Sequence, residues 1–200
     1  PHFKDSNRRN WYNSNTLLNV DLSLSYTERY PYKASLQTDG LSDDKEKTNI
    51  PGGNNVSVTF SLDWNAARTG RFDMQAMVSD SVGLQGTLPV LFGLDGEPPT
   101  GSIASSVDVS ETETFDVTWS PGLDGSGSGV SGRYQVYVKV DNNDWQLWLD
   151  GFTGTNSLYN GRHGHQYGFQ SLAIDHVGNV EAFQTLPETI TLVDTTADDT

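Results

Sequence analysis

The chain of 200 residues has no cysteine and few basic residues. Without cysteine it cannot form disulfides, cysteine-ligated zinc sites or thiolate nucleophiles. Its 12 Lys and Arg are outnumbered by 26 Asp and Glu, which gives a formal net charge of −14. Nucleic acids and anionic membrane surfaces attract basic residues, so we expect neither of them as a partner.

Long apolar segments are also absent from the sequence. No run of 18 apolar residues occurs, and the most apolar stretch, residues 88–94, is far too short to cross a bilayer. The residues after Pro1 lack the pattern of a secretory signal, so we expect any signal or anchor to lie outside these residues. We therefore expect no membrane insertion.

The chain is rich instead in short segments where apolar and polar residues alternate, at 18–24, 56–62, 72–78, 115–119 and 134–140. A period of two is typical of a β-strand with one face in a core and the other in solvent. Gly and Pro are scattered with Asn, Asp, Ser and Thr between these segments, which favours turns. No segment shows a helical apolar stripe with caps, so the sequence predicts an all-β fold.

One strand and its following turn recur 95 residues apart, as positions 72 and 167 or 80 and 175 show. The two copies share an alternating strand and an Asp-x-x-Gly turn: Phe72, Met74, Ala76, Asp80 and Gly83, then Tyr167, Phe169, Ser171, Asp175 and Gly178. The repeat predicts two domains. In each turn we expect the Asp to accept backbone N–H groups and the Gly to take a positive φ.

The domain boundary is expected at residues 94–100, where Pro98 and Pro99 make a short, stiff linker. We expect a tail or linker at 1–9, a β-sandwich at 10–95, a linker at 96–100, a second β-sandwich at 101–194 and a lead-in to a further module at 195–200.

Four motifs of the second half carry a family resemblance. They are a Phe-x-Val-x-Trp strand at 115–119, a Gly/Ser-rich turn at 124–130, a Tyr-x-Val-Tyr-Val strand at 134–138, and a Gly-His-x-Tyr-x-Phe strand at 164–169 with the turn that follows it to Glu181. With these motifs, residues 98–194 resemble the fibronectin type III-like and Ig-like repeats of bacterial surface and secreted proteins. Residues 10–95 resemble bacterial Ig-like domains more loosely, and the polar stretch at 30–53 leaves the strand topology there open.

The resemblance implies two tandem immunoglobulin-like β-sandwiches of about seven strands each. It also implies a non-catalytic, extracellular or cell-surface spacer, stalk or adhesion module of a larger bacterial protein, monomeric as a fragment and flanked by other domains of its chain. The alternative is a carbohydrate- or protein-binding accessory module of a secreted hydrolase. Because one fold serves many functions, this step rests on analogy.

Acidic loops are the candidate metal sites, with calcium as the cation and no other cofactor expected. Calcium takes six to eight oxygen ligands, which flexible acidic loops supply. The principal candidates fall in the polar stretch of the first domain: Asp39, Asp43, Asp44 and Glu46. Asp124 and the pair Asp95 and Glu97 are further candidates. The competing interpretation for each is a solvated loop with turn-forming Asp residues.

Aromatic side chains are the candidate contacts for a carbohydrate or a cell-surface protein, since exposed rings stack on sugar faces. Tyr26, Tyr30 and Tyr32 cluster in the first domain, and Trp145 lies in the second. The other tryptophans are expected to pack in cores. By resemblance, Tyr167 occupies a tyrosine corner in which its hydroxyl bonds to nearby backbone.

Catalytic motifs are not apparent. His163 and His165 have a spacing that suits one strand face, but no third metal ligand stands at a useful distance in the sequence. No G-x-S-x-G motif occurs. We therefore expect no enzymatic activity.

Overall fold

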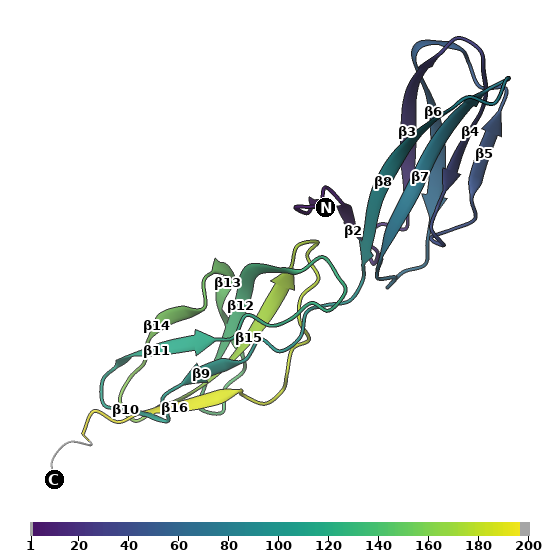
Figure 1. Ribbon diagram of the computed structural model, residues 1–200. Coiled ribbons are helices and arrows are strands. Elements are labelled where there is room, and N and C mark those ends of the chain that lie inside the picture. Colours follow the sequence, from purple (N-terminus) through teal and green to yellow (C-terminus); the bar gives the residue numbers. More distant parts are fainter. Residues whose placement is uncertain (1, 197–200) are drawn as a thin grey trace. The chain divides into compact units, whose positions relative to one another are not determined.

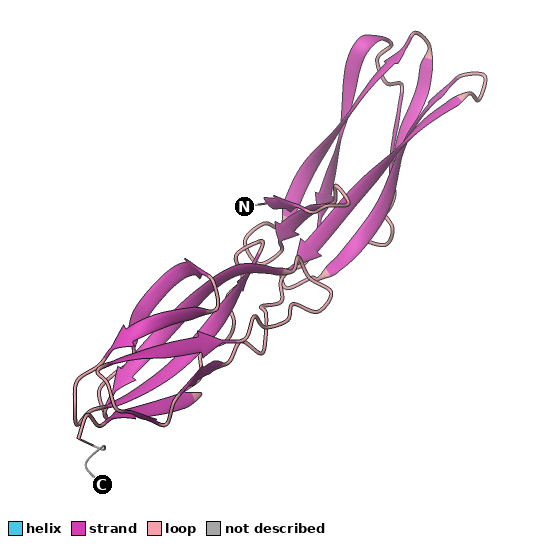
Figure 2. Ribbon diagram, turned by 60° about the vertical axis from the view of Figure 1, so that its left-hand side comes forward, coloured by secondary structure: helices cyan, strands magenta, loops and turns pink. Residues whose placement is uncertain are grey.

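The structure, a computed structural model, describes residues 2–196 and divides into two compact units (Figure 1). The first consists of Pro1–Glu97 with Ser126–Ser128, and the second of Pro98–Gly125 with Gly129–Thr200. All regular structure within the described residues is β-strand (Figure 2). Accordingly, the described part of the chain contains no helix that could span a membrane.

The first unit is a β-sandwich of two unequal sheets. The larger sheet has the order β1-β2-β8-β7-β4-β5, and the smaller is the antiparallel pair β3-β6. The strands are β1 (His2–Lys4), β2 (Asn10–Asn13), β3 (Asn19–Glu28), β4 (Pro31–Gln37), β5 (Lys45–Thr48), β6 (Gly53–Asp63), β7 (Gly70–Asp80) and β8 (Gln85–Asp95).

Alternation along these strands builds the core of the first unit. Alternate residues of β6 and β7 point inward, where Phe60, Leu62 and Met74 are almost fully buried. Trp64 packs edge-on against Phe92 with the ring centroids 5.5 Å apart. Each such side chain stabilises the sandwich by about 1.5–3 kcal/mol through removal of apolar surface from water.

Residues 30–53, whose topology the sequence left open, form a hairpin. β4 pairs with β5 from Lys33↔Thr48 to Leu36↔Lys45. The connecting turn covers the core with Leu41, and Ile50 is buried after β5. The polar composition reflects an exposed edge strand, since the side chains of β5 point mainly to solvent.

The N-terminal residues differ from the tail expected at 1–9. β1 pairs antiparallel with β2, and the buried Arg9 reaches into the larger sheet. The Arg9 guanidinium donates to the carbonyls of Phe72 (3.0 Å) and Phe92 (2.9 Å) and contacts Asp73 (2.6 Å). A buried charge with these partners ties the segment to the domain, an interaction that composition does not reveal.

The second unit is also a β-sandwich, with a five-stranded sheet β10-β16-β15-β12-β13 and a three-stranded sheet β14-β11-β9. The strands are β9 (Ala104–Ser106), β10 (Val109–Ser110), β11 (Thr114–Trp119), β12 (Val130–Val140), β13 (Gln146–Thr153), β14 (Asn156–Asn160), β15 (Gln166–Asp175) and β16 (Thr189–Val193). These eight strands include the two-residue β10.

Aromatic side chains fill the core of the second unit. Trp119 is buried beside Tyr134, with the ring centroids 6.0 Å apart, and Trp148 packs between the two halves of the core. The hydroxyl of Tyr167 accepts the backbone N–H of Arg162 at 2.8 Å. The expected tyrosine corner is thereby confirmed, and it fixes the start of β15.

The two units differ in where the chain enters and leaves each of them. In the first unit, β2 runs parallel to the last residues of β8 with Asn13 opposite Asp95, so both ends of the unit lie together. In the second unit, the chain begins next to Gly122 and Ala173, near the end of β15. It leaves the unit at Val193, whose N–H donates to the carbonyl of His165 at 3.1 Å, just before β15 begins. These two points lie toward opposite ends of β15.

Candidate binding site at the far end of the first unit

The far end of the first unit is defined here as the end opposite Asn13 and Asp95. It contains the connections at 29–30, 49–52 and 81–84, because Pro31 pairs with Asp80 and Glu28 with Gly53. β8 extends from this end to Asp95, a rise of roughly 33 Å for a strand of its length. Side chains at the far end are therefore the part of the unit most remote from its chain ends.

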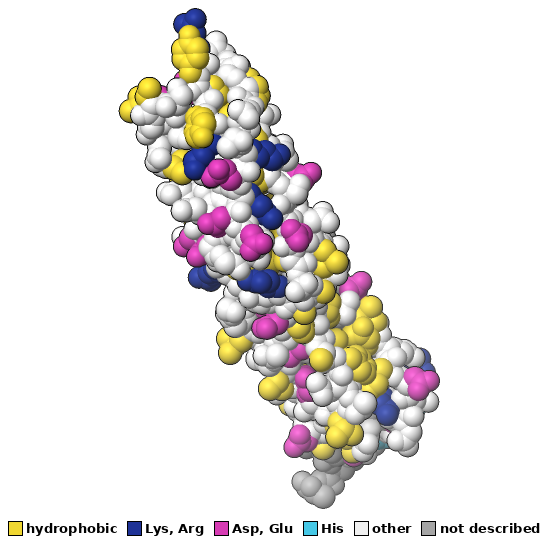
Figure 3. Space-filling model, turned by 90° about the vertical axis from the view of Figure 1, so that its right-hand side faces the viewer, with side chains coloured by type: hydrophobic (Ala, Val, Ile, Leu, Met, Phe, Trp, Pro, Cys, Tyr) yellow, Lys and Arg dark blue, Asp and Glu magenta, His cyan; other side chains and the backbone are white. Residues whose placement is uncertain are grey.

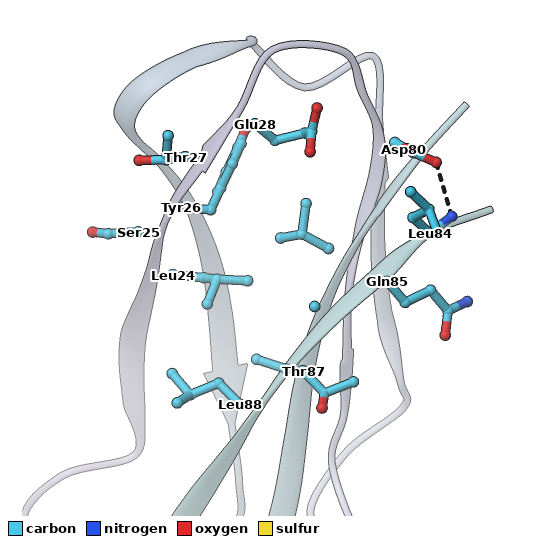
Figure 4. A pocket seen from close by; sticks show the side chains of 13 residues that line it. Leu24, Ser25, Tyr26, Thr27, Glu28, Asp80, Leu84, Gln85, Thr87 and Leu88 are labelled. Carbon is cyan, nitrogen blue, oxygen red and sulfur yellow. Dashed lines mark hydrogen bonds between the residues drawn. The ribbon is translucent and has the colours of Figure 1, made fainter. Parts of the chain in front are cut away.

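A cavity of about 430 Å³ opens between the two sheets at the far end (Figure 4). Leu24, Tyr26 and Glu28 line it from β3, and β7 and β8 form the opposite wall. The volume of this cavity falls within the range of ligand pockets in proteins. Figure 4 shows the side chains of Leu24 and Glu28 pointing from β3 toward the other sheet.

Two leucines at this end face the inside of the sandwich yet stay exposed. Leu88 is paired with the core residue Ala76, so it shares the inner face of the sheet. Leu88 is nevertheless 54% exposed, and Leu84, in the turn just before β8, is 72% exposed. No described strand of the smaller sheet covers them, because that sheet has two strands against the six of its partner.

The tyrosines expected as contacts lie at the same end. Tyr30 and Tyr32 are both exposed, whereas Tyr26 is half-buried and donates its hydroxyl to the carbonyl of Pro51 at 2.7 Å. Burial raises the pKa of Tyr26. On the face drawn in Figure 3, separate hydrophobic side chains (yellow) lie near the tip of the first unit. Carbohydrate binding by these tyrosines stays a prediction.

Two carboxylates border the cavity. Glu28 accepts the backbone N–H of Tyr30 at 3.0 Å, and Asp80 accepts the N–H groups of Val82 and Leu84, both at 2.9 Å. None of the residues that line the cavity is Lys or Arg. The site therefore combines apolar lining residues with two negatively charged carboxylates at its border.

Trp145 lies in the second unit and is partly buried. Its ring packs edge-on against Phe183 at 5.7 Å, and its indole N–H is 3.4 Å from the carbonyl of Thr185. One ring with these contacts presents less open surface than Tyr30 or Tyr32. Its role as a contact residue is not tested by this geometry.

The four principal calcium candidates are exposed, and three of them have separate partners. Asp39 accepts the N–H of Asp73 at 2.8 Å, Asp44 accepts that of Thr38 at 2.9 Å, and Glu46 pairs with Lys33 at 2.8 Å. No three of Asp39, Asp43, Asp44 and Glu46 bring carboxylate oxygens within 4.8 Å of one another in the described chain. Calcium binding by this set stays a prediction.

The remaining acidic candidates serve turns. Asp95 is fully buried and accepts the N–H of Glu97 at 3.2 Å, and Asp124 accepts that of Gly129 at 2.6 Å. In the second unit, oxygens of Asp124 and Asp175 lie within 4.8 Å of each other, a proximity that the sequence spacing did not reveal.

Turn formation by the repeated aspartates is confirmed. Asp80 accepts the two N–H groups described above, and Asp175 accepts those of Val177 (2.9 Å) and Asn179 (2.8 Å). Gly83 and Gly178 have φ values of 91° and 92°. The same turn, with an Asp side chain as acceptor and a Gly at positive φ, therefore occurs in both units.

The two histidines considered as metal ligands pair with different carboxylates. His165 Nδ1 is 2.7 Å from Asp141, and His163 Nδ1 is 3.6 Å from Asp194. A backbone hydrogen bond from Gln166, together with the His165 side chain, lowers the pKa of Asp141. These contacts hold strand ends together and do not converge on one point.

Comparison with known proteins shows a similarity of fold and no similarity of sequence family. No protein-family model and no curated protein sequence matches the chain. Similar solved structures include fibronectin(III)-like modules of Clostridium thermocellum CbhA (12% identity, TM-score 0.38, 95% of this chain and 92% of that chain). Others are domains of titin (15%, 0.49, 86% and 57%) and the FN1–FN3 domains of chicken CNTN1 (11%, 0.38, 88% and 60%).

The sequence did not identify Leu84 and Leu88 as exposed residues of the site. It also did not reveal the gap between the two sheets that exposes them. Leu88 belongs to the apolar stretch at 88–94, but only the unequal sheets show that its inner face is uncovered. The strand order of each unit is that of a sandwich, with hydrogen-bonded sheets on either side of an apolar core. In fold, the chain is a pair of tandem immunoglobulin- and fibronectin type III-like β-sandwiches.

Proposed function

We propose that this chain is a non-catalytic module pair of a larger extracellular protein, in which the second unit acts as a spacer and the first unit presents its far end for adhesion. The observation that supports this division is where the chain enters and leaves each unit. A unit whose chain ends lie at opposite ends adds its length to a stalk. A unit whose chain ends lie together projects its far end instead.

Surface chemistry agrees with presentation by the first unit. Its far end carries five exposed apolar side chains, of which Leu84 and Leu88 line the cavity and the others are Tyr30, Tyr32 and Val82. Scattered apolar residues are common on protein surfaces, but a group next to a cavity is typical of a binding site. The excess of acidic residues favours solubility for a protein that works outside the cell.

The test is binding by the whole chain, attached to beads through its C-terminal end. The probes are arrays of immobilised oligosaccharides and of extracellular matrix proteins. We expect at least one probe to bind, and we expect the double substitution Tyr30→Ser with Tyr32→Ser to weaken binding about tenfold, which is about 1.4 kcal/mol.

The matched control is Leu186→Ser, which removes an exposed apolar side chain (76% exposed) from the second unit. Both changes are at exposed positions, so both proteins should fold. The adhesion proposal fails if no probe binds, or if the control weakens binding as much as the tyrosine substitutions do.

A further inference from the structure

The second unit has a strand where the first has a gap. β9 pairs with β11 in the smaller sheet and also packs against β15 and β16. β3 is the counterpart of β11, since Asn19 and Thr114 begin these strands 95 residues apart, as 114 − 19 shows, the period of the repeat. The first strand of the first unit, β1, pairs with β2 instead, and β2 runs parallel to β8 as β10 runs parallel to β16. No described strand pairs with the second edge of β3.

The cavity lies beside that open edge. In the second unit, the inner-facing residues Thr191 and Val193 of β16 are fully buried. By the registers of the two sheets their counterparts in the first unit are Phe92 and Leu94, which are buried as well, whereas Leu84 and Leu88 nearer the far end are exposed. A strand placed beside β3 at the far end, where the cavity opens, would cover these leucines.

The edge of β3 is also suited to hydrogen bonding. β3 has ten residues without Pro or Lys, the residues that commonly protect strand edges from pairing. Its ladder with β6 is regular from Asn19 to Tyr26. β8, by contrast, carries Pro89, which cannot donate a backbone hydrogen bond. An added strand would therefore pair with β3.

We propose that the first unit binds an extended segment of another polypeptide, which adds as a strand to the free edge of β3 and places apolar side chains over Leu84 and Leu88. Backbone hydrogen bonds supply affinity in such strand addition, and pockets for alternate side chains supply selectivity. The inference rests on the proposed role of the far end in adhesion and specifies the chemistry of the partner.

Charge identifies that partner as basic. Glu28 and Asp80 are the charged residues of the cavity lining, and the whole chain carries −14. A second copy of this acidic chain would bring like charge to the site. The segment that fits has apolar residues at alternate positions and Lys or Arg next to Glu28 and Asp80.

The probe is a ten-residue peptide with valine at alternate positions, threonine between them and two lysines at one end, titrated calorimetrically into the whole chain. The control peptide has proline in place of the central threonine. Since proline lacks an N–H and disrupts a strand, we expect it to bind at least about tenfold more weakly than the probe.

Gly86→Phe is the blocking variant. Gly86 lines the cavity opposite Val78, has no left-handed φ, and has open space where a Cβ would lie. Phenylalanine should fill the gap without loss of stability and weaken probe binding by about tenfold or more. The matched control Gln75→Phe lies on the exposed outer face of β7 and should change affinity by less than about twofold.

Three results would overturn the strand-addition proposal: no binding of the probe, equal binding of the proline peptide, or equal binding by Gly86→Phe. A wild-type dimer that Gly86→Phe dissociates would assign the edge to a second copy and would also overturn it. If the probe fails while binding on the arrays depends on Tyr30 and Tyr32, adhesion stands and only strand addition is lost.

Discussion

Glu188 connects the first strand of the second unit to the opposite sheet. One of its carboxylate oxygens accepts the N–H of Ala104 (2.6 Å) and that of Ser171 (3.0 Å). Burial raises the pKa of Glu188, the two backbone hydrogen bonds oppose that change, and the charge of Glu181 adds to it. The carboxylate of Glu188 accepts backbone N–H groups that a neighbouring strand would otherwise accept in a sheet. Burial removes water from its charge, which is unfavourable.

The stability of the second unit should therefore depend on the protonation of Glu188. A pKa that is higher in the folded state means that the contribution is present below the ordinary glutamate pKa and is lost as pH rises through the folded pKa. We expect Glu188→Gln to keep the acceptor oxygen and to gain stability relative to wild type as the pH rises from about 4 through the folded-state pKa of Glu188. Calorimetry across this range measures it. Parallel pH profiles for the two proteins would contradict the assignment.

The Asp-x-x-Gly turns are the elements that the two units share most closely, and they differ in burial. Asp175 is 2% exposed and also accepts the side-chain amide of Asn179 at 2.7 Å, whereas Asp80 lies in a half-buried position. Removal of a buried acceptor leaves N–H groups without partners or water, so burial sets the penalty.

We expect Asp175→Ala to destabilise the second unit by about 3 kcal/mol and Asp80→Ala to destabilise the first by about 1 kcal/mol. Each effect should appear in the unfolding transition of its own unit, which calorimetry resolves. Equal effects, or a larger effect for Asp80→Ala, would mean that burial does not determine the contribution of this turn.

The strands, the two units and the repeated turn follow from alternation and from the 95-residue repeat, because both are local patterns. Pairing partners do not follow. β1 and β9 are each the first strand of a unit, yet β1 pairs with β2 and β9 with β11. That choice depends on contacts such as those of the buried Arg9 with Phe72 and Phe92, which are remote in sequence. The open edge of β3 is a consequence of that choice and was not predictable for the same reason.

The candidate site was predictable only in part. Tyr30 and Tyr32 stand out in the sequence as a cluster of rings, and the structure exposes both. Leu84 and Leu88 look like ordinary strand residues, because alternation predicts which face they occupy but not whether another strand covers that face. The acidic candidates were predicted from composition, and hydrogen bonds within turns account for several of them.

At the scale of the whole molecule, one fold is used in two ways. The second unit covers the edge of β11 with β9, and the chain passes from one of its ends to the other. The first unit keeps both chain ends together and leaves the edge of β3 open at the far end. A strand edge is a liability for aggregation unless it is protected or used. We infer that the edge of β3 is used to bind an added strand.

Amide hydrogen exchange on the whole chain tests that claim most directly, with the second unit as an internal reference. In the free chain, we expect fast exchange for the β3 amides that point away from β6, and slow exchange for the β11 amides that pair with β9. Addition of the lysine-tailed valine and threonine peptide should slow exchange in β3 and leave β11 unchanged. Slow exchange along both edges of β3 in the free chain, or no change when the peptide is added, would contradict it.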